Sequence, residues 1–355
     1  MDCGPGYEPC ARIFMGYLEE NMRLNPIFTS HMVFAADKPV RIYGEGEGDI
    51  TVSMAGQIKK TAAQNGKWMA ELEKMPCGGP YELIISSGTE KIVLEDVWMG
   101  QVYLCAGQSN MQLRLEETLF PQEQYESNGS LRFFATARME DNEPFFPQDG
   151  WMISTRETAG QRSAIGYLAG NEMTRRKQSA VGIICCYQGA SIIESWVPAG
   201  TFERAGIDIP LEQRHPERAA GKDAAWNEDG ALYEYGLSQV VPFSLSGVFW
   251  YQGESDGLRA EGREYAAELK ELIAVWRRDF GDEKLPFVIV QLADFCKAAD
   301  PEGWKLIQAA QAEVGRTVNG VSTVVCADVC ENHLIHPMKK EELSHRAAEA
   351  MDSLT

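Results

Sequence analysis

The sequence carries little positive charge for its length. Lysine and arginine number 33 and aspartate and glutamate number 52 among 355 residues, which leaves a net charge of −19 at pH 7. A protein that binds the phosphate backbone of DNA or RNA needs a positive face, and so does one that adheres to an anionic membrane. We therefore expect no nucleic-acid partner and no membrane partner. A neutral or weakly charged ligand fits this balance better.

Long apolar runs and a targeting segment are also missing. No stretch approaches the roughly 18 uninterrupted apolar residues that a membrane-spanning helix needs. Residues 1–6 do not form a basic leader before an apolar stretch, so we expect no signal peptide and a cytoplasmic location. The pattern GxxxxGK[ST] is absent, which excludes a phosphate-binding loop of that type.

The nine cysteines are scattered and include no CxxC pair. Cys326 and Cys330 are followed by His333 and His336, and a zinc site is one interpretation of this group. Structural zinc sites usually bring their cysteines in closer pairs than this. We therefore predict reduced thiols, no metal and no cofactor.

Residues 25–95 contain short alternating segments separated by turn residues. The expected strands are 40–43, 50–54, 66–72 and 81–85. Several strands at this spacing are typical of a small β-sandwich. We predict an N-terminal β-sandwich accessory domain over residues 1–95, in which about the first 22 residues remain unassigned.

From residue 97 onward, apolar runs alternate with longer segments of helical spacing. The expected strands are 97–104, 181–186, 247–250, 286–292 and 321–326, and the expected helices are 164–176, 263–280, 305–314 and 339–351. Runs that are apolar throughout are typical of strands buried on both faces of a parallel sheet. The alternation predicts an α/β domain over residues 96–355, decorated by the charged, Gly- and Pro-rich segment 198–229.

Small polar clusters follow four of these predicted strands. They are Gly107-Gln108-Ser109-Asn110, Gln188-Gly189-Ala190-Ser191, Gln252-Gly253-Glu254-Ser255 and the loop 332–337. In an open parallel sheet, ligands bind outside the carboxyl ends of the strands. We therefore expect the four clusters to meet at one edge of the sheet and to form a site there.

The residue types in these clusters favour acyl transfer to water. A serine hydroxyl attacks a carbonyl only after an imidazole takes its proton, and Ser109 and His336 supply those two groups. The negative oxygen that forms needs preorganised N–H donors. Gly189 has no side chain to block its backbone N–H, and Gln252 offers a side-chain amide. The sequence therefore predicts metal-free esterase chemistry.

Other polar residues complete the predicted pocket. Its members are Gln108, Asn110, Glu194, Trp196 and Glu254. We expect Glu254 to hold a sugar hydroxyl or a structural hydrogen bond, and Asn110 to support the serine turn. For Glu194 and Trp196 the alternatives are the pocket floor and the core. Glu254 and Asp328 could instead act as the paired carboxylates of a glycosidase, but Ser109 would then have no role.

At these residues the sequence resembles a known family. The segments 107–111 (Gly-Gln-Ser-Asn-Met), 189–196, 250–255 (Trp-Tyr-Gln-Gly-Glu-Ser) and 335–337 with Lys340 after them are similar to the sialate O-acetylesterases, carbohydrate acetylesterases of the SGNH hydrolase superfamily. The resemblance extends over about residues 25–351. It implies a three-layer α/β/α hydrolase domain, often preceded by a β-sandwich, and an acetylated carbohydrate as substrate.

The resemblance also implies roles for particular residues. Ser109 corresponds to the nucleophile and His336 to the general base, while the N–H of Ser109, the N–H of Gly189 and the amide of Gln252 correspond to the oxyanion hole. Many relatives carry an Asp two or three residues before the histidine, where this sequence has Leu334 and His333.

The third member of the catalytic set therefore stays open. Asp328, Glu331, a backbone carbonyl and no group at all are the alternatives, the last of which would be a Ser–His dyad. The orienting group mainly fixes the imidazole tautomer, so its loss slows such an enzyme without changing its reaction.

The implied function is serine-dependent hydrolysis of acetyl esters on sugars, through an acetyl-serine intermediate. The sugar is an acetylated sialic acid or a plant oligosaccharide such as a xylo-oligosaccharide. The alternatives are a carbohydrate-binding homologue with impaired catalysis, and an esterase for another acyl ester.

Overall fold

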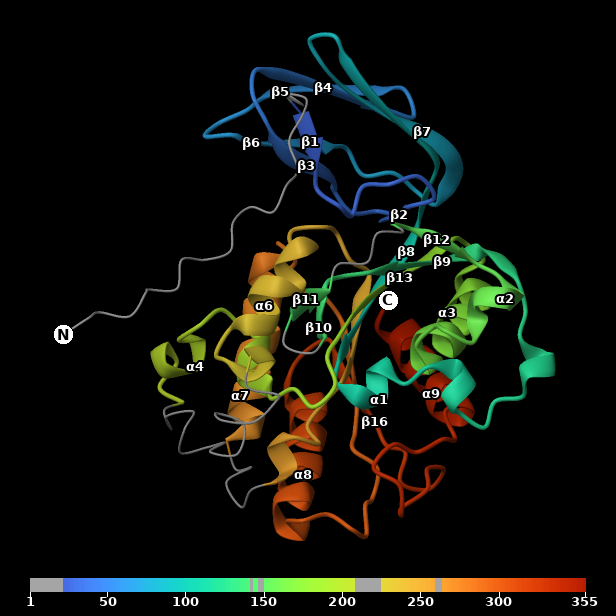
Figure 1. Ribbon diagram of the computed structural model, residues 1–355, viewed down its shortest axis with the longest axis vertical. Helices are drawn as coiled ribbons and strands as arrows, with labels where there is room; N and C mark the ends of the chain where they lie inside the picture. Colours follow the sequence, from blue (N-terminus) through green and yellow to red (C-terminus); the bar gives the residue numbers. More distant parts are fainter. Residues whose placement is uncertain (1–21, 141–142, 146–149, 208–224, 259–263) are drawn as a thin grey trace.

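The computed structural model describes residues 22–140, 143–145, 150–207, 225–258 and 264–355. A small all-β unit sits at one end of a larger α/β unit (Figure 1). The unassigned first residues of the predicted accessory domain lie outside the described residues, as does the middle of segment 198–229.

The small unit is the predicted β-sandwich. One sheet has the order β1 (Met22–Leu24), β3 (Val40–Gly46), β6 (Lys67–Leu72). The other sheet has the order β5 (Gln57–Ala62), β4 (Asp49–Met54), β7 (Gly78–Ser87) and then the first half of β8 (Glu90–Gly107). Strand β2 (Val33–Ala35) also pairs with β8. Alternate residues of β6 are buried, because one face of each sheet packs on the other.

Strand β8 connects the two units. Its first half pairs with β7 and its last residues, Gln101 to Gly107, pair with β13 in the larger sheet. The predicted domain boundary at residues 95 and 96 falls inside this strand, at Asp96, whose φ is 54°. The two units are therefore built on one continuous strand.

The larger sheet has the order β12-β9-β13-β8-β14-β15-β16, parallel except for β12. Its other strands are β9 (Asn128–Ala135), β12 (Met152–Ser154), β13 (Val181–Tyr187), β14 (Gly247–Tyr251), β15 (Phe287–Val290) and β16 (Val321–Val324). The five apolar runs predicted as strands are confirmed. The sequence did not reveal β9, whose first residues are Asn, Gly and Ser.

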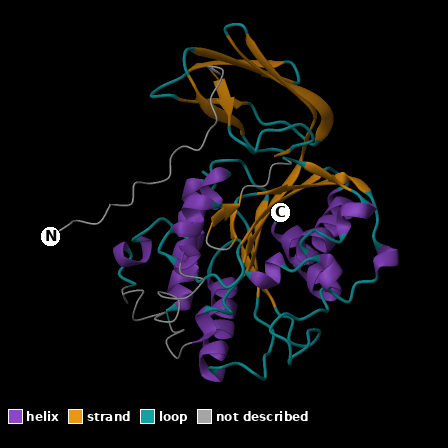
Figure 2. Cartoon of the chain, viewed as in Figure 1, coloured by secondary structure: helices purple, strands orange, loops and turns teal. Residues whose placement is uncertain are grey.

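Helices cover both faces of this sheet, which makes the predicted three-layer α/β/α domain (Figure 2). On one side lie α3 (Ala164–Lys177) and α9 (Glu341–Leu354), and on the other α7 (Tyr265–Asp279) and α8 (Pro301–Thr317). All four helices occur where helical spacing predicted them. No helix within the described ranges combines the length and the apolar character needed to cross a bilayer.

Short elements complete the larger unit. They are α1 (Ser109–Gln112), α2 (Arg156–Ala159), α4 (Thr201–Arg204), α6 (Ala231–Tyr235), the hairpin strands β10 (Arg138–Glu140) and β11 (Glu143–Phe145), and the 3₁₀ turns η1 (Leu115–Glu117), η2 (Gln122–Gln124), η3 (Ile193–Trp196), η4 (Ala225–Asn227), η5 (Leu237–Gln239) and η6 (Asp256–Leu258). Several of them follow the carboxyl ends of the parallel strands, where the predicted polar clusters lie.

Candidate active site

Ser109 lies at the turn between β8 and α1, in the middle of the sheet. The turn depends on Gly107, whose φ is 136°. A Cβ on Gly107 would lie 2.1 Å from the carbonyl oxygen of Tyr251 on β14. Only glycine fits this close approach, so the tight turn places Ser109 directly outside the end of β8.

His336 reaches Ser109 from the loop that follows β16. Its Nε2 lies 2.7 Å from the Ser109 Oγ, across a sequence separation of 227 residues. Burial lowers the pKa of His336 from 6.5, the positive charge of Lys340 lowers it further, and Glu117 opposes them. The imidazole is therefore neutral at pH 7 and free to accept a proton from the hydroxyl.

The structure does not bring Asp328 to His336. Both oxygens of Asp328 accept hydrogen bonds at 2.8 Å from Arg346 on α9, and the carboxylate is exposed. Glu331 accepts from the N–H groups of Met338 and Lys339 at 3.1 and 3.3 Å. Within the described part of the chain, His336 Nδ1 has no hydrogen-bond partner. Of the alternatives for the third member, the geometry favours the Ser–His dyad.

Two backbone N–H groups lie next to the serine. The Ser109 N–H at the start of α1 donates to no group among the described residues. Gly189, just past the end of β13, lies beside Ser109: its Cβ, if present, would be 3.7 Å from the Ser109 Cβ. The Gly189 N–H donates to the Gln112 side-chain oxygen at 2.9 Å. A substrate oxygen must displace Gln112 to use this donor.

The structure corrects the sequence-based prediction that the Gln252 amide belongs to the oxyanion hole. Its amide nitrogen donates to Ser191 O at 3.0 Å and to the Asp256 carboxylate, and its oxygen accepts from the Tyr265 hydroxyl at 2.7 Å. Both amide N–H bonds are therefore engaged away from Ser109. Because the side chain is fully buried, it holds the loops after β13 and β14 together rather than facing a substrate.

Two predicted pocket residues also have structural roles. Gln108 is buried, and its oxygen accepts from the N–H groups of Gly253 and Ser255 at 3.2 and 3.3 Å. It therefore fixes the turn after β14. Trp196 is fully buried edge-to-face against Trp250, with ring centroids 5.8 Å apart, so the core alternative is confirmed for it.

Glu194 and Asn110 lie in buried surroundings at the same sheet edge. Glu194 is 6% exposed in η3. Asn110 donates to Glu254 Oε1 at 2.5 Å and to the carbonyl of Ile335 at 2.9 Å. The expectations that Asn110 supports the serine turn and that Glu254 holds a structural hydrogen bond agree with these contacts.

Comparisons with known proteins identify the family of the chain. Residues 99–353 match the family model described as carbohydrate esterase, sialic acid-specific acetylesterase. The chain belongs to this family. A solved carbohydrate acetylesterase from Xanthomonas citri is similar over 93% of this chain and 74% of its own, with 27% identity and a TM-score of 0.81.

Curated relatives of this family member include the sialate O-acetylesterases of Homo sapiens and Pongo abelii. Each is 26% identical, over 86% and 82% of this chain respectively. The chain spans 65% of the length of the human protein and 61% of that of the Pongo abelii protein.

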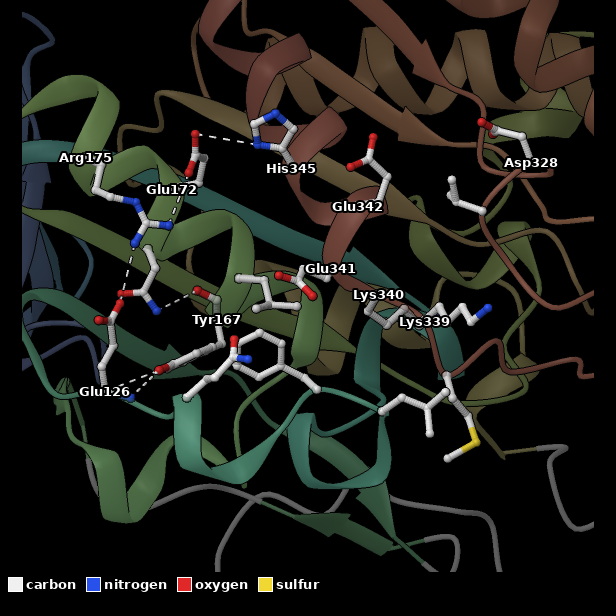
Figure 3. Close-up of a pocket in the computed structure, with 17 residues that line it drawn as sticks. Glu126, Tyr167, Glu172, Arg175, Asp328, Lys339, Lys340, Glu341, Glu342 and His345 are labelled. Atoms are coloured by element: carbon white, nitrogen blue, oxygen red, sulfur yellow. Dashed lines mark hydrogen bonds and ion pairs between the residues drawn. The ribbon is translucent and has the colours of Figure 1, made fainter.

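A cavity of about 1070 Å³ lies between α3, α9 and the loop that carries His336 (Figure 3). Neither Ser109 nor His336 lines it. Met338 and Lys339 are part of its wall, so the loop that carries His336 borders this cavity as well as the dyad.

The structure does not bring together the four residues of the alternative zinc site, which are Cys326, Cys330, His333 and His336. The described residues include no group of three or more His, Cys, Asp or Glu placed to hold a metal ion. Cys326 Sγ donates to Gln291 O at 3.3 Å, and Cys330 Sγ to Lys339 O at 3.8 Å. His336 is engaged with Ser109.

Sequence reasoning assigned no role to Gln112, and it named Lys340 only among the residues that carry the family resemblance. Gln112 sits three residues after the serine, at a position that reads as an ordinary helix residue. Lys340 follows an exposed lysine, and a Lys-Lys pair normally indicates a solvated surface. Lys340 is nevertheless only 1% exposed.

Proposed function

We propose that this protein is a carbohydrate O-acetylesterase that works with a Ser109–His336 dyad. The 2.7 Å contact between the hydroxyl and a neutral imidazole carries the proposal. The adjacent Ser109 and Gly189 N–H groups add to it, since they can share a developing negative oxygen. Membership of the acetylesterase family supports the acyl group and the class of substrate.

The reaction begins with proton transfer. His336 Nε2 takes the proton of Ser109 as Oγ attacks the acetyl carbonyl carbon. The carbonyl oxygen becomes negative and accepts hydrogen bonds from the Ser109 and Gly189 N–H groups once Gln112 has moved away. One such donor typically lowers the barrier by ~3 kcal/mol.

Collapse of this intermediate breaks the bond to the sugar oxygen. Protonated His336 gives its proton to that oxygen, and the deacetylated sugar leaves. Water then attacks acetyl-Ser109 while His336 takes its proton. His336 returns that proton to Ser109 Oγ as the acyl–oxygen bond breaks, which frees the serine and releases acetic acid that ionises to acetate. No carboxylate among the described residues hydrogen-bonds to His336, so this scheme uses no acidic third residue.

The substrate we propose is an acetylated sugar with little net charge. The relatives are named for sialate and carbohydrate esters, while the net charge of −19 disfavours strongly anionic sugars. Acetylated xylo-oligosaccharides therefore stand beside acetylated sialic acids as candidates.

The test measures acetate release from acetylated sialic acid, acetylated xylo-oligosaccharide and p-nitrophenyl acetate. We expect Ser109→Ala to lower kcat by at least about 10³-fold. Asp328→Asn, which alters only an exposed ion pair, should retain activity within about twofold. If the wild type binds acetylated sugar but releases no acetate, and serine-directed probes fail to label Ser109, the binding-protein alternative replaces this proposal.

A further inference from the structure

A chain of three buried polar side chains lies behind the dyad. Asn110, Glu254 and Lys340 are 2%, 3% and 1% exposed. Lys340 Nζ donates to Asn110 Oδ1 at 2.7 Å, and Asn110 Nδ2 donates to Glu254 Oε1 at 2.5 Å. Lys340 also lies over the ring of Tyr251, 4.8 Å from its centroid.

Burying a lysine side chain costs free energy, because its ammonium group loses its contacts with water. Removing an ammonium group from water carries a penalty of several kcal/mol that its partners only partly offset. A methionine or leucine would fill the same volume without that penalty. The position of Lys340 therefore calls for an explanation other than packing.

The contacts of Asn110 provide that explanation. Asn110 follows Ser109, and its Nδ2 donates to the carbonyl of Ile335, the residue before His336, at 2.9 Å. A single amide thus joins the serine turn to the histidine loop. These segments come from opposite ends of the larger unit's sequence, and no carboxylate among the described residues hydrogen-bonds to the imidazole.

Lys340 sets the direction in which this amide points. An amide can rotate by 180° and exchange its nitrogen and oxygen. In the rotated form the oxygen of Asn110 would face the carbonyl oxygen of Ile335 and the Glu254 carboxylate, and its NH₂ would face the ammonium group. Lys340 and Glu254 therefore favour the one orientation that ties Ile335 to the serine turn.

We propose that Lys340, acting through Asn110, is a positioning residue that holds His336 against Ser109 and takes over the orienting task of the missing acid. The proposal rests on the acetylesterase function proposed above. It assigns to a lysine and an amide the alignment that a carboxylate provides in many relatives.

The charges around His336 and Lys340 determine how the pH profile of the enzyme should respond to a substitution of Lys340. His336 faces Lys340 and Glu117. Lys340 faces Glu254, Glu331, Cys326 and Cys330, and burial lowers its pKa to about 8. Lys340 is therefore mainly charged while His336 titrates, and this charge lowers the pKa of His336.

The first experiment compares Lys340→Met with Lys339→Met, its exposed neighbour. For Lys340→Met we expect kcat on p-nitrophenyl acetate to fall by about 10- to 100-fold, the effect of a small misplacement of reacting groups, with KM changed less than about threefold. The lower limb of the pH profile of kcat/KM should move to higher pH, because a charge that favours neutral His336 has gone. Lys339→Met should change neither quantity.

The second experiment uses Asn110→Ala, which decides the question if Lys340→Met fails to fold. Its kcat should fall by a similar factor, and the double variant should be no slower than the slower single variant, because both residues act through one contact. Additive losses, or wild-type kcat and pH profile in folded Lys340→Met or Asn110→Ala, would overturn the proposal. A wild type without Ser109-dependent activity would instead overturn the function itself.

Discussion

At the scale of single residues, the reactivity of Ser109 depends on which neighbours are free and which are engaged. The imidazole of His336 is free to take a proton, because burial and Lys340 keep its pKa low. The Gly189 N–H is engaged by Gln112. Each of these states leads to a measurable consequence.

Gln112→Ala should make the enzyme faster. Displacing an internal hydrogen bond costs about 0.5–1.5 kcal/mol, and the variant no longer bears that cost when substrate enters. We expect kcat/KM for p-nitrophenyl acetate to rise by about 2- to 10-fold. Exposed Gln122→Ala is the matched control. A fall in kcat/KM would mean that Gln112 supports the site instead of occupying it.

Glu254 should make stability depend on pH. Burial raises its pKa from 4.5 to about 7. Between these pH values the folded protein keeps a proton that the unfolded chain has lost, so the free energy of unfolding falls as pH rises and then levels off above about pH 7. This fall in the free energy of unfolding should amount to about 1–3 kcal/mol. Glu254→Gln should remove it.

Urea unfolding at pH 5 and pH 7.5 measures the effect of Glu254→Gln. Exposed Glu349→Gln should leave the difference between the two pH values as it is in the wild type. The same difference in Glu254→Gln as in the wild type would show that another group is responsible.

At the scale of elements, the active site depends on strands that end side by side. Strands β13, β8 and β14 are neighbours and parallel. Their carboxyl ends therefore deliver Gly189, Ser109 and Gln252 to one edge of the sheet. The turn at Gly107 is the tightest point of this arrangement, since the backbone of β14 leaves no room for a side chain there.

Gly107→Ala should damage both stability and the site. A Cβ would collide with Tyr251 O, and the φ of 136° is unfavourable for alanine. We expect the free energy of unfolding to fall by about 2–4 kcal/mol. A serine-directed probe should also label Ser109 more slowly. Gly129→Ala, where nothing lies within 4 Å of an added Cβ, is the control. Unchanged melting and labelling in Gly107→Ala would contradict the strained turn.

At the scale of the whole molecule, the sandwich and the α/β unit share more than the strand β8. Phe34 of the sandwich stacks on Phe243 of the larger unit with ring centroids 5.3 Å apart. Arg41 donates to the carbonyl of Phe280 at 2.9 Å. These contacts attach the sandwich to the larger unit.

Phe243→Ala should therefore destabilise the whole chain in one cooperative step. Truncating a fully buried phenylalanine costs about 3–5 kcal/mol. Circular dichroism and tryptophan fluorescence should report coincident urea transitions at lower denaturant concentration. Ile58→Ala, at a 71% exposed position, should shift the midpoint little. Two separated transitions would show that the units unfold independently.

The sequence by itself predicted the layers and the Ser109–His336 pair that we propose to react. Periodicity and apolar runs indicate local structure directly, and they predicted the sandwich, the sheet and the four main helices. Position after a strand is a backbone property, so Ser109, Gly189 and His336 could be assigned to one edge. Their residue types then favoured acyl transfer.

Only the tertiary structure decided where the side-chain hydrogen bonds go. Asp328 binds Arg346 and Gln252 binds Ser191 and Asp256, so neither has the role that its sequence position suggested. The contacts of Gln112 with Gly189 and of Lys340 with Asn110 are indicated by no local pattern. The physical reason is that a polar side chain bonds to whichever groups the fold brings within about 3 Å, and such groups need not be near in the sequence: Ser191 lies 61 residues from Gln252.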